Sequence, residues 1–370
     1  MKVMTILGTR PEIIRLSRVI PLLDEHADHY LVDTGQNFND RLNANFFREL
    51  RVRSPDLRLN VRAATFAKQV GQILERTEQA LVKVRPDRVL ILGDTNSGLA
   101  AVIARRLGIP VFHMEAGNRC YDDRVPEEIN RRVIDHCSSI LLSYTERSRE
   151  NLLREGIEGK RILVIGNPIK QVIDAYGSDI DRSDALARLR VEERGFFLAT
   201  LHRAENVDDP VKLRRLLTAL GLVARRVRIP VICSLHPRTR SKIIRFGIKR
   251  LPVGVRFLQP FGFFDFIRLE RAAFCVLTDS GTVQEEACLL GVPAVTIRDV
   301  TERPETIECG SNMLSGGDPE SVLAAVELVS SLGRSWIPPR EYLMTQVAEA
   351  ACRTICQEPG HLTHPRVGLM

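Results

Sequence analysis

The sequence predicts an α/β protein with two doubly wound sheets. Short, apolar, β-rich runs alternate with longer helical patterns along most of the chain, and the alternation forms two successive series. The 370 residues are enough for about two domains at roughly 150 residues each. Alternation of this kind is typical of parallel strands joined by helices. We therefore expect two Rossmann-like domains facing a central cleft, with ligands outside the carboxyl ends of the strands.

Six strands are expected in the first series and five in the second. The first series comprises 3–7, 30–33, 88–92, 110–114, 140–142 and 161–164. The second comprises 197–200, 231–235, 255–258, 274–277 and 294–297. Gly166-Asn167-Pro168 ends the first series and a polar stretch follows it, so the boundary is placed at residue 168. The expected domains are 1–168 and 169–340, and the C-terminal segment 341–370, helical to about residue 356, is expected to pack back on the first domain.

Composition and charge exclude several classes of protein. Basic residues number 53 and acidic residues 46, a net charge of +7 that is spread along the chain without a groove-entering motif, so no nucleic-acid partner is expected. No apolar run approaches the roughly 18 residues of a membrane span, and the N-terminal apolar stretch is too short for a signal peptide. The eight cysteines are scattered without a C-x-x-C pair, which predicts neither a disulfide framework nor a metal site. A cytoplasmic protein without membrane association is expected.

Charged residues follow several strands of the first series. Arg10 lies in the turn after the first strand, where a helix start and the nearby Arg15 predict an anion site; a plain tight turn is the alternative. Asp94 follows the third strand and is either a helix cap or a functional carboxylate. Glu115 ends an apolar strand, a position that packing does not explain, and it is the better functional candidate.

A helix start at residue 126 supplies a third carboxylate, Glu127, and a further cation, Arg131. The alternative interpretation is a set of ion pairs four residues apart, Glu127 with Arg131 and Glu128 with Arg132, each worth about 0.3–0.5 kcal/mol. Such pairs do not explain why three carboxylate-bearing segments lie at one predicted edge. General acid and base catalysis does need converging carboxylates.

The second series repeats the pattern with phosphate-binding chemistry. His202 follows the first strand of this series beside an arginine, as a phosphate contact or proton donor would, although a lone histidine is usually structural. His236 repeats the arrangement on the next strand with weaker support. Small residues join a strand to a helix at Ser280, Gly281 and Thr282, whose amides form a candidate phosphate cradle. Glu286 lies further along that helix, where a carboxylate can bind ribose hydroxyls.

An ordered set of motifs spans nearly the whole chain. The motifs are GTRPE (8–12), GDT (93–95), HMEAGNR (113–119), PEEINR (126–131), HR-x-EN (202–206), TDSGT-x-QEE (278–286) and ERPE (302–305). Together they resemble the non-hydrolysing UDP-N-acetylglucosamine 2-epimerase family. The resemblance implies a glycosyltransferase-B-type fold, no metal, no nicotinamide or other cofactor, and inversion at C2 of a UDP-2-acetamido sugar for polysaccharide precursor synthesis. It also implies a homodimer.

The resemblance assigns residues to the two parts of the substrate. The sugar is expected among Arg10, Asp94, Glu115, Glu127, Arg131 and His202. UDP is expected at Phe266, Ser280, Gly281, Thr282, Glu286 and Arg303, and Arg15 and His236 are further candidates for substrate binding. The implied chemistry removes the C2 proton, eliminates UDP to a 2-acetamidoglycal and adds UDP back after protonation from the opposite face. Asp94, Glu115 and Glu127 are expected to move protons, and His202 with Arg10 to act on the departing phosphate; which carboxylate serves which face stays open.

Two departures from the family pattern bear on function. Arg15 replaces the usual lysine, and Gln36-Asn37-Phe38 replaces a glutamine-histidine-arginine stretch that contributes to activation by substrate. The segments 13–17, 93–97, 113–120 and 260–266 look closest to a branch that forms UDP-N-acetyl-L-fucosamine from its 6-deoxy-L-talo epimer. The competing functions are a retaining UDP-sugar glycosyltransferase, which needs an acceptor groove, and a non-catalytic nucleotide-sugar binding protein, which needs no acids.

Overall fold

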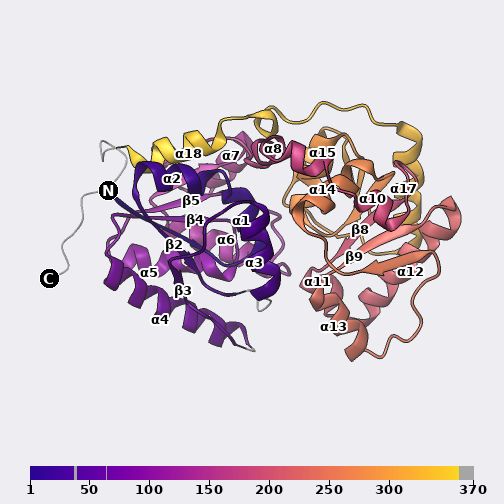
Figure 1. Cartoon of the computed structure of the whole chain (residues 1–370), viewed down its shortest axis with the longest axis horizontal. Helices are drawn as coiled ribbons and strands as arrows, with labels where there is room; N and C mark the ends of the chain where they lie inside the picture. The colour runs from indigo at the N-terminus through magenta and orange to yellow at the C-terminus, as the bar shows by residue number, and fades with distance from the viewer. Residues whose placement is uncertain (37–39, 64, 358–370) are drawn as a thin grey trace. The chain divides into compact units, whose positions relative to one another are not determined.

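The computed structural model describes residues 1–36, 40–63 and 65–357 (Figure 1). Its contacts divide the chain into two compact units. The first unit comprises Met1–Ala175 and the chain from Glu341, and the second comprises Tyr176–Arg340. The contacts therefore group residues 169–175 with the first unit, whereas the sequence places them after the boundary. Asn37, Phe38 and the tail after Pro359 lie outside the described residues.

The first unit contains a seven-stranded parallel sheet in the order β3-β2-β1-β4-β5-β6-β7. Its strands are β1 (Lys2–Leu7), β2 (Asp28–Asp33), β3 (Leu57–Arg58), β4 (Arg88–Leu92), β5 (Val111–Met114), β6 (Ile140–Ser143) and β7 (Ile162–Val164). The strand β3 is not among the predicted strands. The chain leaves β1 toward β2 on one side and returns to β4 on the other, so the direction of winding reverses between β1 and β4.

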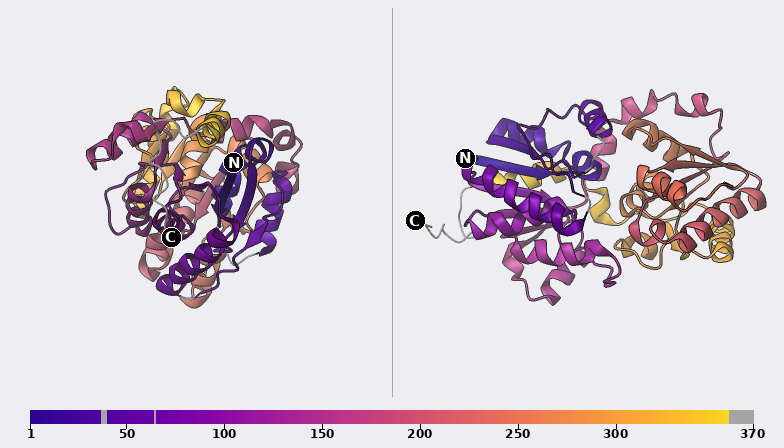
Figure 2. Two further views of the ribbon diagram at one scale, coloured as in Figure 1. Left: turned by 90° about the vertical axis from the view of Figure 1, so that its left-hand side faces the viewer. Right: turned by 90° about the horizontal axis from the view of Figure 1, so that it is seen from below.

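Helices cover both faces of this sheet, with α2 and α18 on one face and α4 and α5 on the other (Figures 1 and 2). The helices of the first unit are α1 (Arg10–Leu16), α2 (Val19–His26), α3 (Asp40–Glu49), α4 (Phe66–Val84), η1 (Asn96–Leu99), α5 (Ala100–Arg106), α6 (Pro126–Cys137), α7 (Glu146–Arg154), η2 (Gly159–Arg161), α8 (Ile169–Ala175) and α18 (Val347–Cys356). A short turn, η3 (Arg340–Leu343), leads into α18. In the first unit α18 packs on α2, and the side chain of Gln171 on α8 bonds Glu349 and the amide of Ala348.

The second unit contains a six-stranded parallel sheet in the order β10-β9-β8-β11-β12-β13. Its strands are β8 (Phe197–Leu201), β9 (Val231–Leu235), β10 (Val255–Leu258), β11 (Cys275–Thr278), β12 (Ala294–Thr296) and β13 (Asn312–Leu314). Its helices are α9 (Gly177–Asp181), α10 (Ala185–Leu189), α11 (Ala204–Val207), α12 (Pro210–Val227), α13 (Pro237–Arg245), α14 (Phe263–Ala272), α15 (Gly281–Leu290), α16 (Pro304–Glu308) and α17 (Pro319–Leu332). The winding reverses between β8 and β11, as it does between β1 and β4.

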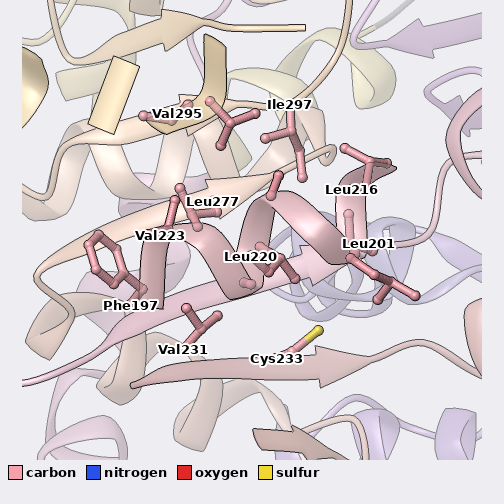
Figure 3. Packing of buried hydrophobic residues seen from close by; sticks show 14 of the residues in the cluster. Phe197, Leu201, Leu216, Leu220, Val223, Val231, Cys233, Leu277, Val295 and Ile297 are labelled. Atoms are coloured by element: carbon pink, nitrogen blue, oxygen red, sulfur yellow. The ribbon is translucent and has the colours of Figure 1, made fainter. Parts of the chain in front are cut away.

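Packing on both faces explains why the strands read as continuous apolar runs. Phe197 and Leu201 of β8 point toward Leu216, Leu220 and Val223 on one face of α12, in a cluster that also includes residues of β9 and β11 (Figure 3). The alternate residues of β8, such as Leu198, enter a second buried cluster on the other face. A sheet buried on both sides is a rigid support for side chains at the ends of its strands. The predicted fold class is confirmed.

None of the described helices combines the length and the apolar character that a membrane crossing requires.

Candidate active site

Several of the predicted functional residues follow the strands at which the winding of each sheet reverses. In open α/β sheets the connections after the two strands at this point lead to opposite faces, which leaves room for a ligand at their carboxyl ends. The connections that follow β1 and β4 carry Arg10 and Asp94 in the first unit. Those that follow β8 and β11 carry His202 and Ser280 in the second.

The turn after β1 is tightly packed and supports an anion site. A side chain at Gly8 would bring its Cβ within 2.1 Å of Thr34 Oγ1 and 2.3 Å of Ser97 Oγ, so only glycine fits there. The next residues start α1, where Thr9 is the N-cap. The guanidinium of Arg10 faces the ring of Phe46 at 5.7 Å, and burial lowers its pKa. Arg10 makes no ion pair with any described side chain, which suits a cation that binds a ligand anion.

Glu12 completes this turn and is a residue to which the sequence assigned no role. Its carboxylate is buried and accepts hydrogen bonds from the amides of Gly8 (3.0 Å) and Thr9 (2.7 Å) and from the hydroxyls of Thr9 (2.7 Å) and Thr95 (3.2 Å). Burial outweighs these bonds and raises the pKa of Glu12 to about 7. The bond to Thr95 joins the ends of β1 and β4.

Asp94 pairs with Arg131 and does not act as a helix cap. Its Oδ2 accepts from Arg131 Nε at 2.9 Å and lies 2.8 Å from Arg131 Nη2. The N-cap of the helical turn after β4 is Thr95. The guanidinium of Arg131 also bonds Glu128, so the cation is held between two carboxylates. This pairing brings α6 to the end of β4.

Glu115 lies next to this pair on a strained backbone. Its φ of 67° is in the left-handed region, which a non-glycine residue adopts only when its surroundings enforce it. Its carboxylate lies 3.8 Å from Arg15 Nε, accepts from Asn118 Nδ2 at 3.2 Å, and is 3.8 Å from where a Cβ on Gly93 would be. Glu115 therefore faces the end of β4, beside the segment that carries Asp94.

Arg15, which replaces the lysine of the family pattern, is built into the unit. It is buried, donates through Nη1 to Asn167 Oδ1 at 2.9 Å, and stacks against the ring of Tyr144 at 5.5 Å. A lysine would keep the charge but lose the second bond and the planar stacking. Arg15 is thus placed to hold the carboxylate of Glu115.

The structure places Glu127 in the first turn of α6, half-buried and one turn before Arg131. Its neighbour Glu128 is fully buried and accepts from the amides of Cys120 and Tyr121, both at 3.1 Å. The alternative Glu128–Arg132 ion pair is present at 3.3 Å. Glu128 is therefore structural, because it anchors the loop before α6.

His202 is held by an aspartate to which the sequence assigned no role. Asp279, directly after β11, is fully buried and accepts from the amides of His202 (2.9 Å) and Arg203 (2.9 Å), and its Oδ1 lies 3.0 Å from His202 Nδ1. Burial raises the pKa of Asp279, but the charge and hydrogen bond of His202 and the two amides outweigh it and lower the pKa to about 2. The ring of His236, the N-cap of α13, lies 5.6 Å from that of His202. The signal for Asp279 was its position after a buried strand, as with Asp94.

The start of α15 is the second candidate anion site. Ser280 is the N-cap of α15, and its amide already donates to Thr278 Oγ1 at 2.9 Å. The other two predicted amides, those of Gly281 and Thr282, belong to the first residues of the helix, where amides have no carbonyl partner inside the helix. The guanidinium of Arg303 lies beside Gly281 and donates to Glu285 Oε1 at 2.5 Å.

Two further candidates lie in the same unit. Glu286 is buried on α15. Phe266 is partly buried on α14 and packs against the core cluster of the other sheet face. Within residues 1–36, 40–63 and 65–357, no three His, Cys, Asp or Glu side chains gather as metal ligands.

Several known proteins resemble this chain in sequence. A model of the family described as UDP-N-acetylglucosamine 2-epimerase matches residues 22–355. The UDP-N-acetylglucosamine 2-epimerase of Methanocaldococcus jannaschii is 41% identical over 350 residues, covering 92% of this chain and 95% of that protein. The UDP-2,3-diacetamido-2,3-dideoxy-D-glucuronate 2-epimerase of Pseudomonas aeruginosa is 39% identical over 340 residues, covering 90% and 93%.

Solved structures show the same two-domain fold. The crystal structure of the M. jannaschii enzyme in complex with UDP-GlcNAc and UDP matches with a TM-score of 0.91 and 39% identity, covering 96% of this chain and 99% of that one. The Neisseria meningitidis enzyme bound to UDP-GlcNAc matches with a TM-score of 0.84 and 26% identity, again covering 96% and 99%. Sequence motifs, fold and relatives agree: the chain belongs to the UDP-N-acetylglucosamine 2-epimerase family, an isomerase family with a two-domain, glycosyltransferase-B-type fold.

Proposed function

We propose that this protein is a non-hydrolysing C2 epimerase of a UDP-2-acetamido sugar that supplies a polysaccharide precursor. One observation carries the proposal beyond family membership: Asp94 follows β4, where the first sheet reverses its winding, Glu115 follows the neighbouring strand β5, and each lies beside a buried arginine. A nucleotide-binding protein without catalysis needs no such carboxylates. A retaining glycosyltransferase needs an acceptor groove, and the relatives named above are epimerases.

The proposed reaction is an elimination followed by an addition. A base removes the C2 proton while the bond between C1 and the phosphate oxygen breaks, which gives UDP and a 2-acetamidoglycal. An acid then protonates C2 from the opposite face, and the UDP oxygen adds back to C1. No redox cofactor and no net consumption of water are needed, so the only product is the C2 epimer.

The residues divide between these steps by their chemistry. Asp94, Glu115 and Glu127 supply the carboxylates that accept and return the C2 proton, a role worth about 10²- to 10⁴-fold in rate. Arg10 and His202 stabilise the phosphate oxygen that leaves. Asp279 orients His202, since its hydrogen bond to Nδ1 leaves Nε2 for the substrate.

UDP is proposed to bind the second unit. The amides of Gly281 and Thr282 and the guanidinium of Arg303 form an anion site at the start of α15. We assign the ribose hydroxyls to Glu286 and the uracil ring to Phe266, with Ser280 and His236 as further contacts of the diphosphate.

Relatives favour two classes of substrate. UDP-N-acetylglucosamine, which equilibrates with UDP-N-acetylmannosamine, is the first candidate because the M. jannaschii relative carries that name. A UDP-2,3-diacetamido uronate is the second, because a relative of nearly the same identity carries that name. The UDP-N-acetyl-L-fucosamine branch stays a prediction. We also propose that the protein is a homodimer and is located in the cytoplasm. Sedimentation equilibrium of the purified chain tests whether it is a homodimer.

Incubation with a UDP-sugar alone tests the function. The purified protein is mixed in deuterium oxide with each of the candidate UDP-sugars, and proton NMR follows C2. We expect one sugar to equilibrate with its C2 epimer and the product to carry deuterium at C2 from the first turnover. A product that keeps its original C2 hydrogen would contradict the elimination mechanism, and no change in any sugar would favour the binding protein or the transferase.

A further inference from the structure

Four side chains of alternating charge form a buried network beside the start of α15. Arg298 Nη2 lies 3.2 Å from Glu205 Oε1, and Arg298 Nη1 donates to Glu302 Oε2 at 2.8 Å. The other carboxylate oxygen of Glu302 accepts from Arg203 Nη2 at 2.9 Å. The Arg298 and Glu302 side chains are only 1% and 2% exposed. The network therefore joins the segment after β8 to the loop after β12.

The carboxylate of Glu302 lies directly against the anion site. A Cβ added to Gly281 would lie 3.0 Å from Glu302 Oε1, so this oxygen lies close to the first residue of α15. A negative charge at the place where a diphosphate is proposed to bind opposes binding by simple electrostatics. The position of this carboxylate therefore needs an explanation. Stabilisation of the fold is a weak one, because apolar residues can often replace a buried ion pair without loss of stability.

The contacts of Glu302 indicate what that role is. Two arginines and two glutamates cancel in the network, so it adds no net positive charge to the site. Glu302 instead fixes the orientation of Arg203, because its Oε1 holds the guanidinium of Arg203 on the side of Gly281. Arg203 directly follows His202, and the amides of both are fixed by Asp279. Backbone and side chain of Arg203 are thus both held at the end of β8.

We propose that Glu302 is a positioning residue of the diphosphate subsite, which fixes Arg203 beside the amides of Gly281 and Thr282 while Arg298 neutralises its second oxygen. The inference rests on the proposed function, because it takes the start of α15 to be the site for the phosphates of UDP. It extends that function by assigning a role to a carboxylate that touches no reacting atom.

The affinities for UDP and for uridine, measured by ligand-observed NMR, separate positioning from general damage. Uridine has the base and the ribose but no phosphate. Glu302→Gln should weaken UDP binding by about tenfold, the effect of one misplaced hydrogen bond to a charged group, and leave uridine binding unchanged. Tighter UDP binding by Glu302→Gln would show that the carboxylate acts only by repulsion, and an equal loss of UDP and uridine would show a merely structural role. Either result overturns the proposal.

Two further variants keep the test independent of folding. Arg203→Lys keeps the charge but loses the planar fork, so it should weaken UDP binding as Glu302→Gln does, and the double variant should be no worse than either single one. Wild-type UDP affinity in Arg203→Lys would overturn the proposal even if Glu302→Gln does not fold. Glu327→Gln is the control, because it removes an exposed ion pair with Arg226 in the same unit and should change neither affinity. A wild-type protein that does not bind UDP would overturn the proposed function itself.

Discussion

Replacing Asp279 by asparagine should both destabilise the second unit and slow the reaction. The carboxylate of Asp279 is fully buried and its pKa is lowered from 3.8 to about 2, a difference that corresponds to about 2.5 kcal/mol of stabilisation by its hydrogen-bond donors. Asparagine has the same shape but only one acceptor oxygen, and its NH₂ group faces N–H donors. The free energy of unfolding at pH 7 should therefore fall by about 2–3 kcal/mol.

The pH dependence of the wild type gives the same quantity independently. Because the folded-state pKa of Asp279 is lower than the unfolded one, its stabilisation is complete above about pH 4 and is lost as the pH falls toward about 2. Urea unfolding followed by tryptophan fluorescence measures it, since the chain has one tryptophan, Trp336, whose Nε1 donates to Cys288 O in the second unit. The difference between wild type and Asp279→Asn should shrink over this range of pH.

Catalysis provides the second readout. Without its carboxylate partner, His202 no longer has a fixed orientation, and turnover should fall by at least about 10²-fold. Asp208→Asn is the matched control: Asp208 pairs with Arg238 at 2.6 Å in the same unit, is well exposed, and should cost at most about 1 kcal/mol with little loss of turnover. An Asp279→Asn variant with wild-type turnover would refute the assignment of His202 to the reaction.

Three further outcomes are expected. Glu286→Ala should raise KM for the UDP-sugar more than it lowers kcat, because a ribose contact is shared by ground and transition states. Steady-state kinetics measure both constants, and a fall in kcat with unchanged KM would contradict this assignment. Asp94→Asn and Glu127→Gln should each lower turnover by at least about 10²-fold with unchanged circular dichroism. Near-normal turnover in either variant would show that the replaced residue has only a structural role. Because burial raises the pKa of Glu12 from 4.5 to about 7, the free energy of unfolding of the wild type should fall by about 3 kcal/mol as the pH rises from about 4.5 to about 7. In urea titrations the Glu12→Gln variant should lack this part of the pH dependence. The same pH dependence in variant and wild type would contradict the reasoning.

Sequence patterns predicted the sheets well because their strands are buried on both faces. Every predicted strand is present with its ends within two residues, whereas β3 (Leu57–Arg58) and β13 (Asn312–Leu314) were not predicted. Both are edge strands of two or three residues, and each has a neighbour on one side only. Such short strands bury few side chains, so they leave little apolar periodicity for a sequence to show.

The candidate site was predicted less completely, for a different reason. The residues that we propose face the ligand, such as Asp94 and His202, are marked by their position after a strand. The residues that hold them are marked only by tertiary contacts: Asp279 binds a histidine 77 residues away, and Glu302 binds an arginine 99 residues away. Local sequence carries no information on which of several polar residues will meet across a sheet.

A common arrangement in both units explains why these partners matter. Three candidate functional side chains, Asp94, Glu115 and His202, each pair with an oppositely charged or hydrogen-bonding residue that is more deeply buried. The side-chain exposures are 24% for Asp94 against 3% for Arg131, 10% for Glu115 against 1% for Arg15, and 33% for His202 against 0% for Asp279. A buried partner has its own rotamer fixed by packing, so it transmits the rigidity of the sheet to a group that must remain accessible to substrate. Removing the outer residue of a pair should then lower the rate with little loss of stability, because the cavity left is open to water. Removal of the inner one should lower both, because it leaves unpaired polar atoms inside the unit.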